Sequence, residues 1–192
     1  MRRHFIKYIY SGIFSISFFL CLKVAIPSPA ESIDTRDSEI IKKYQKIILE
    51  EPSNLNAHFN LGILYYRNAL FDEAVREFRK VLDINPNDSE AYYNLGNVFN
   101  KKNLFDDAID SYKKATAINS NDAGIFHNLG NAYAGKGMID DAISSYKKAI
   151  EINPNLAESH KSIAYLYKKK GQTTESIQSF EKAAKSNSKD IP

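Results

Sequence analysis

The sequence predicts an all-α protein built as a linear array of helix pairs, and two recurring sequence motifs support this. The motif Asn-Leu-Gly recurs every 34 residues, beginning at Asn60, Asn94 and Asn128. A second motif, an acidic pair followed by alanine, recurs at the same interval, beginning at Asp72, Asp106 and Asp140. A fixed period of this length is typical of stacked repeats, in which each unit packs on its neighbours, and not of one globular core.

Four units of this period follow one another without insertion, at 55–88, 89–122, 123–156 and 157–190. Places within a unit are counted from its first residue, so that the glycine of Asn-Leu-Gly takes the eighth place. Each unit is predicted to form two short helices, because its apolar residues recur at spacings of three and four. In the second unit the first helix carries Tyr92, Leu95 and Phe99, and the second carries Ala108, Tyr112 and Ala115.

Residues that end helices recur at the same places. Asn103, Gly137 and Gly171 follow the first helix of their units, and these residue types tolerate a left-handed backbone. Ala69 occupies this place in the first unit, so we expect neighbouring Asn68 to end the helix instead. The second helices begin with acids and carry basic doublets further along, an order that suits the helix dipole and predicts a solvated outer face.

Small residues at the eighth place predict close helix packing. Gly62, Gly96 and Gly130 let the two helices of a pair approach, while Phe78, Tyr112 and Tyr146 are expected to fill the space between pairs. The resulting pattern, aromatic–x2–Leu–Gly–x2–Tyr, then Ala–x3–Phe/Tyr, Ala and Pro, covers 55–190 and resembles the tetratricopeptide repeat (TPR). Single departures include Ala164 for glycine and Ser120 for proline. The resemblance implies a right-handed superhelical solenoid of antiparallel helix pairs with a concave inner face.

The two ends of the array are predicted to differ from its interior. Residues 31–54 read as a linker and a capping helix at Asp37–Glu50, in which Ile40, Tyr44 and Ile47 take second-helix places. The last unit is more polar where a further unit would dock, as terminal repeats are. Its Ile177 and Phe180 remain apolar, which makes this edge a candidate dimer surface.

Residues 1–30 are predicted to be a signal peptide or a membrane anchor. Basic residues precede the apolar run Tyr8–Leu22, and small residues near Ala30 suit cleavage. As a helix that run spans roughly 22 Å, short of the ~30 Å bilayer core, whereas an extension to Ile26 gives about 28 Å. Residues 8–26 would therefore contact the membrane if uncleaved. Both interpretations predict a membrane-anchored or exported protein.

Charge and composition exclude several classes of function. The chain carries a net charge of +3, but residues 1–30 hold four of its 26 basic residues and no acid. The remaining 22 basic and 23 acidic residues give −1, so no nucleic-acid partner is predicted. Three of the histidines, His58, His127 and His160, are too widely spaced for a zinc motif. No catalytic constellation is present in the pattern, so we predict a protein that is not an enzyme and holds no cofactor.

The inner face is the predicted binding site. In the implied geometry the second, fifth, sixth, ninth and twelfth places of each first helix face the groove. Asparagine recurs at the sixth and ninth places and aromatic rings recur at the fifth, which gives the candidate residues Phe59, Asn60, Tyr93, Asn94, Asn97, His127, Asn128 and Asn131. An asparagine amide can pair with both halves of a peptide bond. An asparagine ladder of this kind is known in TPR arrays that present protein substrates, although asparagine at these places also serves simply to solvate the surface.

The predicted function is that of a non-catalytic adaptor that binds a protein segment in the concave groove and assists assembly or recruitment. Asn94→Ala and Asn128→Ala are expected to weaken binding without loss of stability. Two alternatives remain at this stage. The array could self-associate through its edge helices, as a homo-oligomeric scaffold on the membrane, or it could be a substrate-targeting subunit for a separate enzyme.

Overall fold

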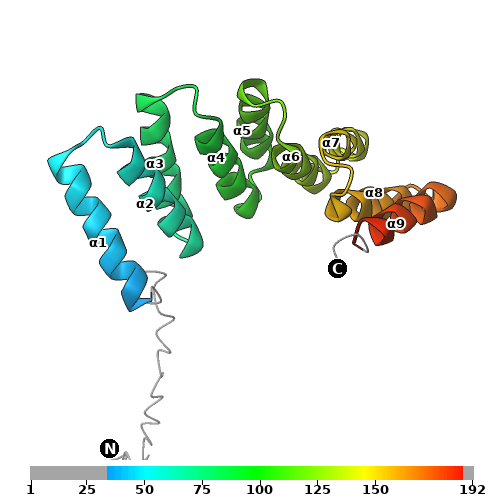
Figure 1. The fold of residues 1–192 in the computed structure, drawn as a ribbon, viewed down its shortest axis with the longest axis horizontal. Helices are drawn as coiled ribbons and strands as arrows, with labels where there is room; N and C mark the ends of the chain where they lie inside the picture. Colours follow the sequence, from blue (N-terminus) through cyan, green and yellow to red (C-terminus); the bar gives the residue numbers. More distant parts are fainter. Residues whose placement is uncertain (1–33, 188–192) are drawn as a thin grey trace, which may run out of the picture.

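The computed structural model describes residues 34–187, and every regular element in this range is an α-helix (Figure 1). The helices are α1 (Thr35–Glu50), α2 (Leu55–Arg67), α3 (Phe71–Ile84), α4 (Ser89–Lys101), α5 (Phe105–Ile118), α6 (Ala123–Lys136), α7 (Ile139–Ile152), α8 (Ala157–Lys169) and α9 (Thr173–Asn187). They follow one another along an arc, with α1 and α9 at its opposite ends. This arrangement confirms the predicted all-α solenoid of helix pairs.

Each pair consists of a first helix and the second helix that follows it, from α2 with α3 to α8 with α9. The side chains of Asn54, Asp88 and Asp122 accept hydrogen bonds from the first turns of α2, α4 and α6 and so cap them. The second helices α3, α5 and α7 have acids in their first turns, as predicted. Their last turns hold no basic residue, because the basic doublets lie in mid-helix, so the predicted interaction of these doublets with the helix dipole was wrong.

An aromatic ring set against a glycine fixes the distance between the helices of a pair. Phe78, Tyr112 and Tyr146 are fully buried or nearly so, and each ring lies on the eighth-place glycine of its own pair. A Cβ atom added at Gly96 would lie 2.5 Å from Cε1 of Tyr112, closer than real side chains approach. These rings were expected to fill the space between pairs. They lie inside their own pairs and also reach the next one, since Phe78 packs with Leu95 and Val98 of α4.

Four first helices end in a residue with a left-handed backbone. Asn103, Gly137 and Gly171 have φ values of 58°, 84° and 75°, which confirms the prediction. Ala69 has φ 57°, so it adopts this conformation itself, and the expectation that Asn68 would replace it was wrong. Asn68 instead donates hydrogen bonds from Nδ2 to the carbonyl oxygen of Leu64 (2.8 Å) and to Asp37 Oδ2 (2.9 Å), and the latter ties α2 to α1.

The capping helix α1 packs on α2 partly as expected. Ile41 is buried with Leu61 and Leu64, and the predicted Ile40 and Tyr44 pack against this cluster together with Ile48. Ile47, also predicted, is only half-buried and lies outside the cluster. Ile41, Tyr44 and Ile48 take the same places as Val75, Phe78 and Leu82, which pack on the next first helix, α4.

Lysines at the ends of first helices link neighbouring pairs. Lys102 forms an ion pair with Asp72, Lys136 with Asp106, and Lys170 with Asp140, in each case between the end of a first helix and the preceding second helix. The three acids are exposed, so each pair contributes little stability. These ion pairs join each helix pair to the next one at the same places.

The predicted signal peptide or anchor at 1–30, including residues 8–26, lies outside the described residues. None of the helices between residues 34 and 187 is both long enough and apolar enough to cross a bilayer.

The backbone at Ala69 generates a stability prediction. Ala69→Gly should raise the free energy of unfolding by up to about 1 kcal/mol, because glycine adopts the left-handed conformation without the Cβ clash that alanine suffers. Gly137→Ala, at the equivalent place, should lower it. Urea unfolding of the three chains measures both changes, and a less stable Ala69→Gly chain would contradict this account of the turn.

Candidate functional site

The predicted groove residues all lie on the first helices of the first three pairs. Phe59 and Asn60 lie on α2, Tyr93, Asn94 and Asn97 on α4, and His127, Asn128 and Asn131 on α6. Contacts between α2 and α4 and between α4 and α6 place these helices side by side. Asn60 is exposed, and the other seven residues are half-buried. The structure therefore brings the predicted residues onto one row of neighbouring helices.

Aromatic side chains at the fifth place rest on the buried rings of the second helices. The ring centroids of Phe59 and Phe78 lie 5.8 Å apart, and those of Tyr93 and Tyr112 lie 6.0 Å apart. The His127 imidazole lies 5.3 Å from the ring of Tyr146. Each of the first three pairs of helices thus contributes one half-buried ring that packs on a buried ring.

Asn97 and Asn131, at the ninth place, accept hydrogen bonds from buried tyrosines. The Tyr112 hydroxyl donates to Asn97 Oδ1 (2.8 Å), and the Tyr146 hydroxyl donates to Asn131 Oδ1 (2.7 Å). Burial raises the pKa of both tyrosines, which keeps these hydroxyls protonated as donors.

The other two units support this pairing of tyrosine with asparagine. Where the ring at this place is a phenylalanine, Phe78 or Phe180, the ninth place holds Ile63 or Tyr165 instead of asparagine. Without a hydroxyl to satisfy, the ninth place needs no amide acceptor. Asparagine at the ninth place is therefore explained first as the acceptor for the tyrosine hydroxyl of its own pair. Comparing the sequences of the four units is enough to find this co-occurrence of tyrosine and asparagine.

Asn128, at the sixth place, joins α6 to α4. Its Nδ2 donates to the Tyr93 hydroxyl (3.0 Å) and to Asn97 Oδ1 (3.0 Å), and its Oδ1 accepts from Asn131 Nδ2 (3.2 Å). Removing this amide would break bonds between two repeats. In contrast to the expectation from the sequence, we therefore expect Asn128→Ala to lower stability.

Asn60 and Asn94 occupy the same sixth place but turn back onto their own helices. The Nδ2 of Asn60 donates to the carbonyl oxygen of Asn56, and that of Asn94 donates to the carbonyl oxygen of Glu90, each at 2.8 Å. The preceding helix explains the difference. Asn128 meets Tyr93 and Asn97, whereas the corresponding places before Asn94 hold Phe59 and Ile63, which offer no acceptor.

The histidines hold structural positions. His58 is buried, with Nδ1 2.7 Å from Glu77 Oε2 and Nε2 2.9 Å from the carbonyl oxygen of Pro52. His160 is buried too, and its Nε2 lies 3.1 Å from the carbonyl oxygen of Pro154. Both replace a core aromatic, as predicted. Among residues 34–187 no cluster of three histidine, aspartate or glutamate side chains could hold a metal ion.

His127 is the one of these three histidines that belongs to the candidate groove residues. Its Nδ1 lies 2.8 Å from Ser159 Oγ of α8. Burial lowers the pKa of His127, and the nearby Glu158 carboxylate opposes that shift. The imidazole is therefore mainly neutral near neutral pH.

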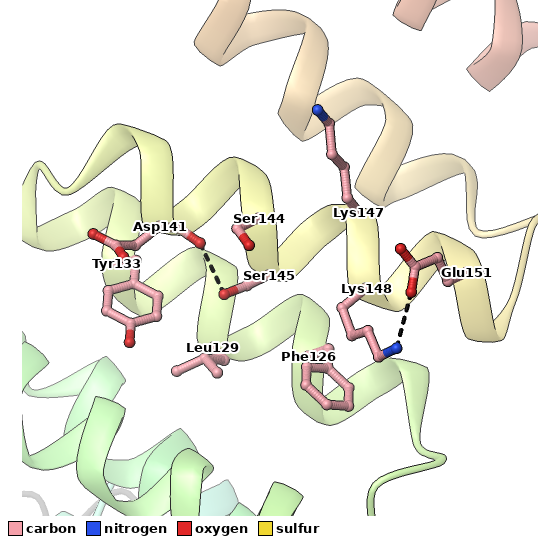
Figure 2. Close-up of a pocket in the computed structure, with 9 residues that line it drawn as sticks. All are labelled: Phe126, Leu129, Tyr133, Asp141, Ser144, Ser145, Lys147, Lys148 and Glu151. Carbon is pink, nitrogen blue, oxygen red and sulfur yellow. Dashed lines mark hydrogen bonds and ion pairs between the residues drawn. The ribbon is translucent and has the colours of Figure 1, made fainter.

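Two hollows lie at the junctions between first and second helices. One, with a volume of about 570 Å³, lies between α6 and α7 (Figure 2). Its apolar floor consists of Phe126, Leu129 and Tyr133, and polar atoms on its rim are already paired: Ser145 Oγ donates to the carbonyl oxygen of Asp141, and Lys148 pairs with Glu151. A second hollow of about 400 Å³ takes the same places one repeat later. Neither is lined by the candidate groove residues.

Family models agree with the geometry. A model described as TPR repeat matches residues 71–103 and 96–137, and two described as tetratricopeptide repeat match 123–156 and 145–178. The chain belongs to the tetratricopeptide repeat family.

Solved structures show the same fold. A crystal structure of MamA is 31% identical to this chain, with a TM-score of 0.75, and the match covers 78% of this chain and 87% of that one. A MamA chain beginning at residue 41, from Desulfovibrio magneticus RS-1, is 22% identical with a TM-score of 0.77, over 82% and 89%. YrrB, described as a TPR protein with an unusual peptide-binding site, is 23% identical with a TM-score of 0.69, over 79% and 78%. No curated protein sequence matches the chain.

The pairing of Tyr112 with Asn97 generates a double-variant prediction. Asn97→Ile alone should lower the free energy of unfolding by about 1–3 kcal/mol, because it leaves the buried Tyr112 hydroxyl without an acceptor. Adding Tyr112→Phe should recover part of that loss, since the first unit already combines Ile63 with Phe78. Urea unfolding of the parent, both single variants and the double variant gives the coupling. Losses that simply add would contradict the pairing.

His127 predicts a pH dependence of stability. Because burial lowers its pKa in the folded state, the unfolded chain binds the proton more readily. Stability present above the unfolded pKa, about 6.5, is lost as the pH falls through the lower folded pKa. Urea unfolding between about pH 7.5 and pH 5 should show a smaller acid loss for His127→Gln than for the parent chain. Equal losses would show that the His127 proton is not involved.

Proposed function

We propose that the chain is a non-catalytic adaptor that binds an extended protein segment along its first helices and thereby assists assembly or recruitment at a membrane or in an exported compartment. The observation that carries this proposal is the orientation of the asparagine amides. Internal hydrogen bonds fix which half of each amide faces outward, so the surface offers donors and acceptors in a set order.

The ninth-place asparagines offer donors. Tyr112 and Tyr146 occupy the Oδ1 atoms of Asn97 and Asn131, so their Nδ2 groups are the halves available to a ligand. Asn97 uses neither Nδ2 hydrogen in a bond within the described part of the chain, and Asn131 uses one. Because the tyrosines are buried, these amides cannot rotate without leaving a hydroxyl unsatisfied.

Two of the three sixth-place asparagines, Asn60 and Asn94, offer acceptors. Asn60 and Asn94 donate from Nδ2 to their own helices, which leaves Oδ1 available for a ligand. An extended peptide presents N–H and C=O groups in alternation, so acceptors at Asn94 and donors at Asn97 and Asn131 match both kinds of group. Because a backbone is recognised, the sequence of the bound segment matters little.

Aromatic side chains supply the apolar part of the contact. Phe59 and Tyr93 are half-buried beside the asparagines, and such rings pack well against the side chains of a bound segment. YrrB, which has the same fold, carries a peptide-binding site. The sequence of residues 1–30, with its basic start and apolar run, supports placing the adaptor at or across a membrane.

The test is photo-crosslinking of the full-length chain in living cells, with the probe at Asn94 and a matched probe on the outer face at Lys113. We expect a discrete adduct from Asn94 and none from Lys113, because only the first position faces the proposed ligand. Mass spectrometry then identifies the partner. Equal adducts from both positions would contradict binding along the first helices.

A matched set of variants separates binding from folding. Asn94→Ala should reduce capture of the crosslinked partner and leave the free energy of unfolding nearly unchanged, because the Asn94 side chain bonds only to its own helix. Lys113→Ala serves as the outer-face control. Leu95→Ala removes a buried core side chain and should lower the free energy of unfolding by about 2–5 kcal/mol. This variant serves as the reference for a folding defect. Loss of stability in Asn94→Ala comparable to that of Leu95→Ala would contradict the proposed role.

A further inference from the structure

The outer side of α9 exposes a place that is covered everywhere else in the array. Val75, Ile109 and Ile143 occupy this place on α3, α5 and α7 with exposures of 9%, 8% and 6%, because the next first helix packs over them. Ile177, at the same place on α9, is 54% exposed. A β-branched side chain at this place is thus buried in three units and exposed to solvent in the fourth.

Two aromatic rings extend this apolar face. Tyr165 of α8 is 62% exposed, and its ring packs edge-on against Phe180 of α9 with centroids 5.2 Å apart. Phe180 is half-buried, whereas Phe78, Tyr112 and Tyr146 at its place are buried. Within the described residues no further first helix covers Phe180, and Ala164 replaces the glycine on which the other rings lie. The C-terminal face is defined as Tyr165, Ile177 and Phe180.

The opposite end of the array carries a second apolar stripe that is only partly covered. Ile40, Tyr44 and Ile47 of α1 take the places that are fully buried or nearly so on α3, α5 and α7, where a first helix covers them. All three are half-buried here: Ile40 and Tyr44 pack against the cluster that α1 forms with α2, and Ile47 lies outside it. The N-terminal face is defined as Ile40, Tyr44 and Ile47.

Opposite charges accompany the two faces. Lys43 lies in the middle of α1 beside Tyr44, and Glu181 lies in the middle of α9 beside Phe180. Both are exposed, and neither forms an ion pair within residues 34–187. Because each charge is central on its helix, they come close together whether the two helices run parallel or antiparallel.

We propose that the C-terminal face of one copy docks on the N-terminal face of a second copy, so that the chain associates head to tail. The contact buries Ile177 and Phe180 against Ile40 and Ile47 and brings Glu181 to Lys43. Because the two faces differ, the contact is heterologous, and further copies add in the same sense. This association leaves the groove of each copy open and so extends, but does not require, the proposed peptide binding.

Cysteine crosslinking of full-length chains tests the proposal, with Cys21→Ser in every chain. One tagged population carries Ile177→Cys, and a differently tagged population carries either Ile40→Cys or Ile47→Cys. On mild oxidation we expect a mixed disulfide between Ile177→Cys and one of the two α1 variants, and the better partner reports the relative direction of the helices. Lys113→Cys, on the outer face, is the matched control and should give no mixed adduct with Ile177→Cys.

Charge reversal supplies an independent readout. Glu181→Lys should lower the yield of the mixed adduct severalfold, and Lys43→Glu in the other population should restore it, because the opposite charges are then exchanged. Adducts of Ile177→Cys with itself alone would overturn the head-to-tail contact in favour of a two-fold one. Absence of any mixed adduct, or loss without rescue on charge reversal, would also overturn it.

Discussion

The contact of a buried ring with a glycine is the constraint on which the rest of this structure depends. Each of Gly62, Gly96 and Gly130 leaves room for one ring from the second helix of its pair, and the ring then fixes how closely the two helices approach. The same ring reaches the next pair, as Phe78 does with Leu95, and so sets the position of the following repeat. In the last pair, where Ala164 stands in place of the glycine, the ring of Phe180 packs edge-on against Tyr165. The packing of one ring therefore determines both the pitch of the array and the character of its last face.

The chemistry of that ring also determines the polar surface. A tyrosine carries a hydroxyl into the core, and the hydroxyl requires an acceptor, which Asn97 and Asn131 supply. The acceptor atom of each amide is then occupied, and its donor is left for a ligand. A residue buried on the second helix thus decides which hydrogen-bonding group the first helix offers to a partner. Core packing and ligand recognition share the same side chains, and variants of these tyrosines would alter both.

Much of the fold could be predicted from the sequence because each unit repeats the same local signals. The period, the eighth-place glycines and the left-handed Gly137 all concern one unit, and four copies reinforce each signal. Ala69 could not be predicted, because tertiary packing overrode the preference of its side chain. The stripe of α1 was found in part: Ile40 and Tyr44 pack on the cluster with α2, but Ile41 and Ile48 make contacts that were expected of Ile47. The candidate groove residues were found by position, but the bonds of Asn128 depend on side chains one repeat away.

The hydrogen bonds of Asn128 affect which repeat units could be duplicated without loss of polar contacts. Asn128 finds its acceptors only because the unit before it holds Tyr93 and Asn97, and it would lose them behind a unit with Phe59 and Ile63. The second and third units therefore form a matched couple, while the first is a poorer neighbour for the third. A duplication that copies 89–156 as a block would keep every amide satisfied within it. A duplication that copies a single unit to a new position would not keep every amide satisfied. The hydrogen bonds between repeats therefore favour the present order of the units.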